Sequence, residues 1–371
     1  EQQWQTRRHR AIRQAEPPPW SEDPRAESFV LEFGDEGRTG WAQLSSTEQR
    51  VDARSGEDPD LVHAIASWLI ARGQRSIALM DDAGRVLADA AISPDELGVA
   101  TLAGPAARLV SLAPSNLECI AALGCFERVI ACEDSSDHPE GVASLERLGP
   151  DLGPDLDRVA ALAPDLVVAS LSVPGMERVV SGLRARGLAC VVLAPRSLAD
   201  MLDDLARLGR LLGVERRADT LREDLGEQIA ALEREADTIG APARVYLEWW
   251  PRPMFSPGQA CYSNELIRLA GGVNVFGERP GSSLEIRPDE LVAADPEVCF
   301  VSWCGVAADK LDPRRLIERP GLGSLAAARA GHVYPLDERF SGRPGPRMLE
   351  AARIMAAGIR RARQVSSAEP R

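Results

Sequence analysis

From residue 108 onward, short apolar runs alternate with segments in which apolar residues recur at helical spacing. The runs at 108–113 (RLVSLA), 166–170 (LVVAS) and 189–194 (ACVVLA) are typical of buried strands. The segments 155–163 and 176–187 place apolar residues three and four positions apart, which predicts amphipathic helices. Strands that alternate with helices predict a parallel sheet whose faces are covered by helices.

A start signal precedes the first helix of this series. Ser115 and Glu118 match the S-x-x-E pattern of a capping box, in which each side chain accepts a hydrogen bond from the other residue's backbone N–H. We therefore expect a helix over 116–124 that Ser115 caps.

The alternating pattern starts again after Pro242, with strand-like runs at 244–249 and 298–303. Residues 157–170 (DRVAALAPDLVVAS) align without a gap on 289–302 (DELVAADPEVCFVS). Both segments begin with an acid, which the dipole favours at the N-terminus of a helix. We predict two similar α/β lobes, at 105–195 and 241–371.

A helical connection is predicted between the two lobes. Residues 197–239 contain no proline, and leucines recur at helical spacing on both sides of Gly213, which we expect to be a joint. The predicted fold is therefore α/β, with two Rossmann-like lobes joined by a long helical backbone at 196–240. We expect that backbone to be a rigid spacer that limits the motion of the lobes.

The first hundred residues have a different organisation. Residues 1–24 are polar and rich in proline, which predicts a flexible arm, and 25–104 are predicted to form a small α+β module whose sequence does not indicate its role. His63 and Trp68 lie on the predicted helix 61–73, and we expect both in its core. The predicted strands of the module are 28–33, 39–44, 76–81 and 86–92.

Charge and hydropathy restrict the partners. The formal net charge of -13 argues against nucleic acid or an anionic membrane, because both attract basic surfaces. No apolar run reaches the roughly 20 residues needed to span a bilayer. The first segment is basic and lacks the apolar core of a signal peptide, so we do not expect it to be a signal itself.

The reactive residue types argue against a metal receptor or an enzyme. The seven cysteines are odd in number and lie mostly in apolar runs without a CxxC pair, so we expect buried free thiols. Of four histidines, only His138 and His332 fall in the two-lobed part, too few for a bare zinc or manganese site. No GxSxG, P-loop or HExxH motif is present, so we expect no catalysis and no catalytic cofactor.

Candidate binding residues follow the predicted strands. In open α/β sheets, ligands bind beyond the carboxyl ends of the strands. Trp249 and Trp250 follow the first strand of the second lobe, and because strand side chains alternate in direction we expect one of them buried and one exposed. The loops at these ends are 113–116, 135–139, 170–175, 249–258, 280–285, 303–305 and 338–345.

Residues 107–362 resemble the class III periplasmic binding proteins, the two-lobed receptors that deliver vitamin B12, haem or ferric siderophores to ABC importers. The resemblance rests on six segments in the family's order: RLVSLAPSNLECIAALG, SDHP, DRVAALAPDLVVAS, NELIRLAGGVNVF, DELVAADPEV and RPGPR. The segment EWWPRP resembles the cobalamin-binding branch. The resemblance implies a non-catalytic receptor that holds a metal chelate in a cleft between two lobes, and cobalamin is the expected chelate.

Carried over to this sequence, the resemblance places His138 beside the corrin ring and Trp250 and Phe255 on its other side. His138 is also a candidate axial ligand to the metal. The acids Asp157 and Asp289, with Glu290, match the surface pair that docks on the transporter; plain helix capping is the alternative. The full set of expected ligand-binding residues is Ser115, Asn116, His138, Ser172, Trp249, Trp250, Phe255, Ser256, Ser283, Trp303, Arg339, Phe340 and Arg343.

Two differences from the vitamin B12 receptors leave other ligands as candidates. Further aromatic residues of vitamin B12 receptors fall on Ser170 and Ser283 here, and Arg339 and Arg343 are suited to pair with carboxylates of haem or a siderophore. A haem or ferric-siderophore receptor is therefore the first alternative. A cytoplasmic corrinoid or haem carrier, or an enzyme that uses this chelatase-like fold, is the second.

The resemblance also bears on location and partners. It implies a monomer in the periplasm or at the cell surface, with an ABC-importer permease as its partner. The seven cysteines and the extra N-terminal module favour the cytoplasm instead, because thiols stay reduced there.

Overall fold

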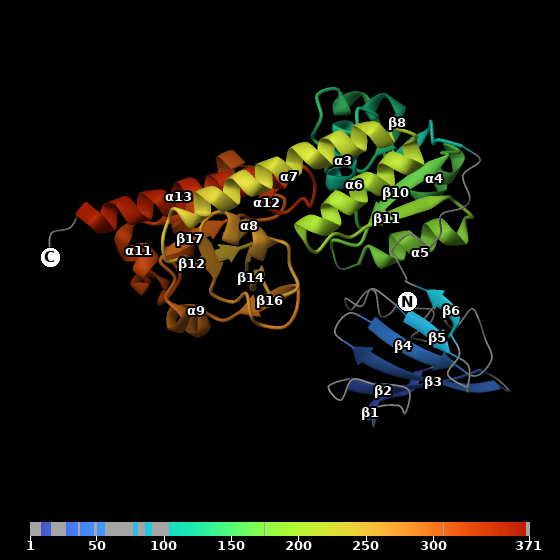
Figure 1. The fold of residues 1–371 in the computed structure, drawn as a ribbon, viewed down its shortest axis with the longest axis horizontal. Helices are drawn as coiled ribbons and strands as arrows, with labels where there is room; N and C mark the ends of the chain where they lie inside the picture. The colour runs from blue at the N-terminus through green and yellow to red at the C-terminus, as the bar shows by residue number, and fades with distance from the viewer. Residues whose placement is uncertain are drawn as a thin grey trace. The chain divides into compact units, whose positions relative to one another are not determined.

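In the computed structural model, the chain forms two compact units (Figure 1). The structure describes residues 104–173, 175–306 and 308–368, and the backbone of six strands before residue 104. Unit 1 comprises 1–103, 108–110 and 148–194, and unit 2 comprises 104–107, 111–147 and 195–371. The domain boundaries expected from the sequence remain predictions.

The six strands before residue 104 form one sheet in unit 1, in the order β1-β2-β3-β4-β5-β6. Neighbours are antiparallel except for the parallel pair β4–β5. The four predicted strands are confirmed, and β1 lies in the segment that we expected to be a flexible arm. The predicted helix 61–73, with His63 and Trp68, lies outside the described residues. The strands are β1 (His9–Ala15), β2 (Glu27–Asp35), β3 (Arg38–Thr47), β4 (Arg50–Ser55), β5 (Ile77–Met80) and β6 (Val86–Ala90).

The rest of unit 1 has the predicted alternation of strands and helices. Strand β10 pairs in parallel with β11, and β7 is the next strand in the order β11-β10-β7. Every residue of β10 and β11 is buried, as expected for strands covered on both faces. The elements are β7 (Leu109–Ser111), α4 (Leu156–Ala161), β10 (Leu166–Ser170), α5 (Glu177–Ala185) and β11 (Cys190–Leu193).

Unit 2 contains a four-stranded parallel sheet in the order β15-β12-β17-β18. Phe300 of β17 packs on helix α13, where a Cβ added at Gly358 would lie 2.9 Å from its ring. Cys299 and Val301, on the opposite face, belong to a buried cluster with Tyr246. These strands are β12 (Ala243–Glu248), β15 (Gly272–Asn274), β17 (Val298–Val301) and β18 (Val333–Pro335), and the helices around them are α8 (Ser263–Leu269), α9 (Pro288–Ala294), α10 (Arg314–Ile317), α11 (Ala326–Ala330), α12 (Glu338–Ser341) and α13 (Met348–Ala368).

Residues 111–147 of unit 2 contribute helix α3 (Pro114–Ala122) and the parallel pair β8 (Val129–Cys132) and β9 (Glu146–Arg147). The predicted capping box is wrong, because α3 begins with Pro114 in its first turn and Ala113 as its N-cap, without a side-chain cap. Proline suits this position since its fixed φ is already helical. Ser115 and Glu118 therefore lie inside the helix, where both are buried. Short 3-10 helices lie at Phe126–Arg128, Val142–Ser144, Ala308–Lys310 and Leu322–Ser324.

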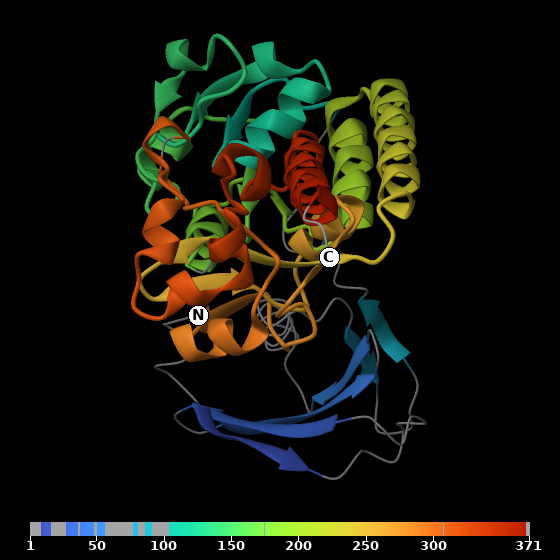
Figure 2. The same ribbon diagram turned by 90° about the vertical axis from the view of Figure 1, so that its left-hand side faces the viewer.

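The helical connection consists of α6 (Leu198–Leu212) and α7 (Glu215–Asp237), and the joint predicted at Gly213 is confirmed by its left-handed φ of 66°. The two helices pack side by side (Figures 1 and 2), so they form a hairpin and not one continuous spacer. At their contact, a Cβ added at Gly209 would lie 2.5 Å from Cβ of Ala218. Helix α7, about 34 Å long at 1.5 Å per residue, also packs against α8 and α13.

All seven cysteines are free thiols. Six of them are buried, as the sequence predicted, and Cys304 is exposed. Among the described helices, none is long and apolar enough to cross a membrane.

Candidate functional site

The candidate site lies at the carboxyl edge of the four-stranded sheet in unit 2. Glu248, Val301 and Pro335 are paired in register across β12, β17 and β18, so the residues that follow them leave the sheet at one edge. The loops after these strands carry Trp249, Trp303 and residues 338–345. This is the edge at which ligands bind in open parallel sheets.

A buried carboxylate holds the segments at this edge of the sheet together. Glu248 is fully buried and accepts hydrogen bonds from Arg319 at 2.6 and 2.7 Å, from the Trp303 indole at 2.9 Å and from the Tyr246 hydroxyl at 3.0 Å. A buried carboxylate is tolerated in a protein interior only when its charge is paired and hydrogen-bonded in this way. The indole of Trp303 is thus held in the interior and is 4% exposed. Its expected contact with a ligand stays a prediction.

An aromatic pair lies on the open face of a small antiparallel sheet formed by β13 (Trp250–Pro251), β14 (Met254–Pro257) and β16 (Ser283–Ile286). Trp250 pairs directly with Phe255, so their side chains share one face. The other face carries Met254, Leu284 and Ile286, which belong to the buried cluster. The small sheet therefore turns one face to the core and presents Trp250 and Phe255 on the other.

The two adjacent tryptophans differ in exposure. Trp250 is 43% exposed, as one of the pair was expected to be, and its indole donates to the carbonyl oxygen of Arg252. Trp249 is half-buried, not buried, and its indole N–H has no acceptor among the described residues. The backbone of Trp249 is held by Phe255 at 2.8 Å and Cys304 at 3.1 Å. The pair is therefore anchored by main-chain bonds while Trp250 stays accessible.

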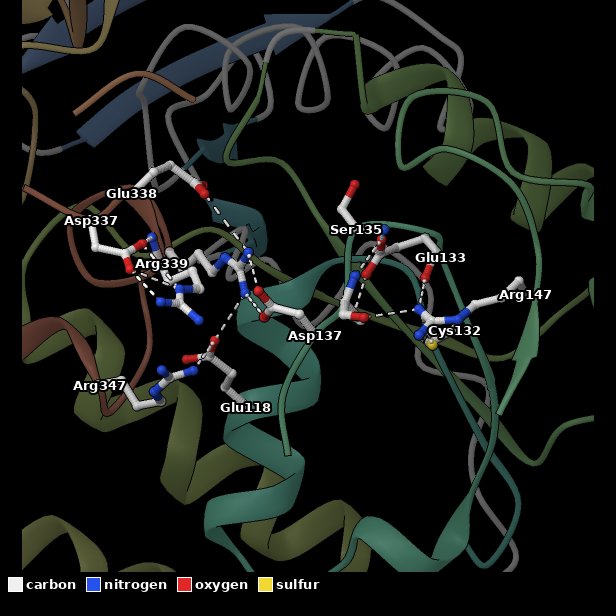
Figure 3. A network of polar contacts seen from close by, with 12 residues as sticks. Glu118, Cys132, Glu133, Ser135, Asp137, Arg147, Asp337, Glu338, Arg339 and Arg347 are labelled. Atoms are coloured by element: carbon white, nitrogen blue, oxygen red, sulfur yellow. Dashed lines mark hydrogen bonds and ion pairs between the residues drawn. The ribbon is translucent and has the colours of Figure 1, made fainter. Parts of the chain in front are cut away.

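An ionic network, shown in Figure 3, joins the loop after β18 to α3 and to the loop after β8, all within unit 2. The Arg343 guanidinium donates to Asp137 at 2.5 Å and to Glu118 at 3.3 Å, and lies 3.7 Å from Glu338. Arg347 donates to the same oxygen of Glu118 at 3.0 Å. These five residues form what we call the Arg343 network.

Glu118 is the most deeply buried acid of this network. Its side chain is 1% exposed, and one carboxylate oxygen has no hydrogen-bond partner among the described residues. Burial raises the pKa of Glu118 to about 6, although the charges of Arg347 and Arg343 act in the opposite direction. The desolvation of the carboxylate outweighs its two ion pairs.

His138, Arg339 and Phe340 lie around the Arg343 network. His138 is half-buried, and burial, with the charges of Arg347 and Arg343, lowers its pKa, so the imidazole is neutral at pH 7. Arg339 is bound to Asp337 by hydrogen bonds of 2.5 to 3.1 Å. The Phe340 ring packs under the Arg347 guanidinium at 5.0 Å.

The arginines expected to meet a ligand are therefore already paired. Arg343 is 8% exposed and holds three protein carboxylates, and its expected pairing with a ligand carboxylate stays a prediction. No cluster of three or more potential metal-ligating side chains is found in the part of the chain that the structure describes. A role of His138 as an axial ligand stays a prediction.

The predicted serines and asparagine are divided between the interior and the surface. Ser115, Asn116 and Ser256 are buried, and their expected ligand contacts stay predictions. Ser283 is exposed on the open face of the small sheet. Ser172 is exposed in unit 1, where its hydroxyl lies 2.8 Å from that of Ser170.

The acids expected to dock on a transporter each carry a neighbouring arginine. Asp157, with its side chain 87% exposed, pairs with Arg186 at 2.8 Å, and Asp289 accepts two hydrogen bonds of 3.0 Å from Arg287. Neither acid is an N-cap, because Asp155 caps α4 and Arg287 occupies that position in α9. The capping alternative is therefore wrong. Glu290 is half-buried and pairs with Arg279 at 3.2 Å.

Several residues of the site were not found in the sequence. Glu248 and Arg319 are 71 positions apart, and Glu118 and Arg343 are 225 apart. The one available signal was the charge of Glu248 at the end of an apolar strand, next to two tryptophans. Such a charge indicates a buried partner but does not identify it.

Comparison with known proteins gives related sequences and folds. Residues 109–340, more than half of the chain, match the family described as periplasmic binding protein. The vitamin B12-binding protein of Vibrio parahaemolyticus is 26% identical over 67% of this chain and 87% of its own length. An uncharacterized ABC transporter substrate-binding lipoprotein of Bacillus subtilis is 25% identical over 68% of this chain and 79% of its own.

A solved structure has the same fold. The periplasmic haem-binding protein of Roseiflexus sp. RS-1 superposes with a TM-score of 0.62 over 69% of this chain and 98% of its own, at 24% identity. The parallel sheets and the matched residues agree with the fold class predicted from the sequence. The chain belongs to the periplasmic binding protein family.

Proposed function

We propose that this protein is the substrate-binding component of an ABC importer and that its ligand is cobalamin or a related corrinoid. The observation that carries the proposal is the pairing of the exposed Trp250 with the half-buried Phe255 on the open face of the small sheet. A corrin is a large, flat, mostly apolar ring, and aromatic side chains bind such surfaces by burial and stacking. The relative named for vitamin B12 supports the same ligand.

The pairing of the arginines favours a corrinoid over haem. Arg339, Arg343 and Arg347 each contact a protein carboxylate within the described residues. At the buried Arg343, a haem or siderophore carboxylate would have to displace a protein acid and leave it unpaired, which costs more than forming a new pair returns. The edge of a corrin carries neutral amides and requires no such exchange.

The family also supports a location and a partner. We propose that the protein acts outside the cytoplasm and that Asp157 and Asp289 dock on basic pockets of a permease. Both acids are exposed, and an exposed ion pair contributes only about 0–1 kcal/mol. Their present partners, Arg186 and Arg287, can therefore be exchanged for arginines of a permease at little cost.

Titration with cyanocobalamin, haemin and a ferric siderophore, followed by tryptophan fluorescence, tests the ligand. We expect quenching by cyanocobalamin at micromolar concentration or below. Quenching by none of the three would refute the proposal. Quenching by haemin or the siderophore alone would identify that compound as the ligand in place of cobalamin.

A pair of tryptophan variants tests the site. Trp250→Ala should weaken binding about tenfold or more, because an exposed aromatic anchor is lost. Trp68→Ala, in the N-terminal module, should leave binding unchanged. Calorimetry is the appropriate measurement, since each variant removes a fluorophore. Equal losses in both variants would show that the effect of Trp250 is structural.

A further inference from the structure

A carboxylate shares the open face of the small sheet with the two aromatic residues. Glu285 of β16 is paired directly with Phe255 of β14, which in turn is paired with Trp250 of β13. Directly paired residues of an antiparallel sheet project from the same face. With neighbouring strands about 5 Å apart, Glu285 lies roughly 10 Å from Trp250 along a single row.

The burial pattern of β16 supports this placement. Ser283 and Glu285 are exposed while Leu284 and Ile286 are buried, which is the strict alternation of a sheet with one face in the core. Glu285 thus stands on the surface that Trp250 and Phe255 offer to a flat ligand.

Glu285 also differs from the other acids of the candidate site. Glu118, Asp137 and Glu338 are engaged by arginines of the Arg343 network, and Glu248 is engaged by Arg319. Among the described residues, the side chain of Glu285 makes no hydrogen bond or ion pair. Its charge is therefore available to a ligand that covers the aromatic row.

We infer that Glu285 is a specificity-determining residue that favours ligands whose edge carries N–H donors and disfavours ligands whose edge carries carboxylates. An ionised carboxylate only accepts hydrogen bonds, so it can bind the amide N–H groups of a corrinoid. The same charge repels the carboxylates of haem, and repulsion between like charges is a recognised means of rejecting a wrong partner. This inference rests on the proposed function and deepens it.

Two substitutions test the inference. In Glu285→Gln the side chain keeps its size and loses its charge, and in Glu285→Arg the charge is reversed. We expect Glu285→Gln to weaken cyanocobalamin binding about threefold and to tighten haemin binding three- to tenfold, with a larger gain for haemin in Glu285→Arg. Opposite changes for the two ligands distinguish a specificity role from damage to the fold, which would weaken both.

The control is Glu318→Gln, an exposed acid at the end of α10 in the same unit. It should leave both dissociation constants unchanged. Raised salt should strengthen haemin binding to the wild type more than to Glu285→Gln, because it screens the repulsion.

The outcomes separate the inference from the function on which it rests. If the wild type binds neither cyanocobalamin nor haemin, the proposed function fails. If the wild type binds cyanocobalamin but Glu285→Gln changes the ratio of the two dissociation constants no more than Glu318→Gln does, the inference is overturned and the function stands.

Discussion

Replacing Arg343 with alanine should destabilise the protein strongly, because it leaves a buried acid poorly compensated. The side chain of Arg343 is 9% exposed and contacts Glu118, Asp137 and Glu338. Removing one partner of a buried ion pair typically costs 3–5 kcal/mol. Two features reduce this cost: Glu118 keeps Arg347, and Asp137 is 43% exposed and can be hydrated. We therefore expect the lower end, about 3 kcal/mol.

The matched control is Arg339→Ala. The side chain of Arg339 is 44% exposed and, among the described residues, forms an ion pair with Asp337 only, so its loss should cost about 1 kcal/mol or less. Equilibrium unfolding in urea, followed by tryptophan fluorescence and circular dichroism, gives both free energies. In the double variant Arg343→Met with Glu118→Gln, part of the loss should be recovered, since the buried charge is gone as well. Equal losses in Arg343→Ala and Arg339→Ala would refute the reasoning.

Three further predictions concern stability and accessibility. Because the pKa of Glu118 is raised from 4.5 to about 6 on folding, its contribution to stability is complete well below pH 4.5 and is lost as the pH rises through 6. The difference in unfolding free energy between wild type and Glu118→Gln should fall by about 1–2 kcal/mol from pH 4.5 to 6.5, and a constant difference would contradict this. Gly209→Ala should destabilise by about 1–3 kcal/mol through overpacking against α7, whereas Gly226→Ala, with open space around it, should stabilise by up to about 1 kcal/mol in the same urea assay. A thiol reagent should modify one cysteine of the native protein, and Cys304→Ser should abolish that reaction; rapid labelling of several thiols would show that the buried ones are accessible.

The sequence was most informative where a pattern depends on local spacing. The strands at β10, β11, β12 and β17 follow from apolar runs, and the joint at Gly213 follows from the conformational freedom of glycine. The spacing of leucines does not indicate the direction of the chain after such a joint. We therefore did not predict that α7 runs back along α6. Gly209 has no side chain, and this permits the close contact of the two helices.

Two local signals competed at the start of α3, and we weighted the wrong one. Ser115 and Glu118 match a capping box, but Pro114 fixes the first turn one residue earlier. Glu118 then points into the interior, where Arg343 and Arg347 pair with it. Charge pairs over such separations depend on the tertiary fold and leave no trace in local spacing.

In the small sheet, the residues that face the surface are different from the residues that pack in the core. Substitutions at positions 250, 255, 283 and 285 alter the face to which we propose that the cargo binds, while the alternate positions 254, 284 and 286 preserve the interior. Under the proposed function, selection can therefore change cargo preference at the first set of positions without loss of stability at the second.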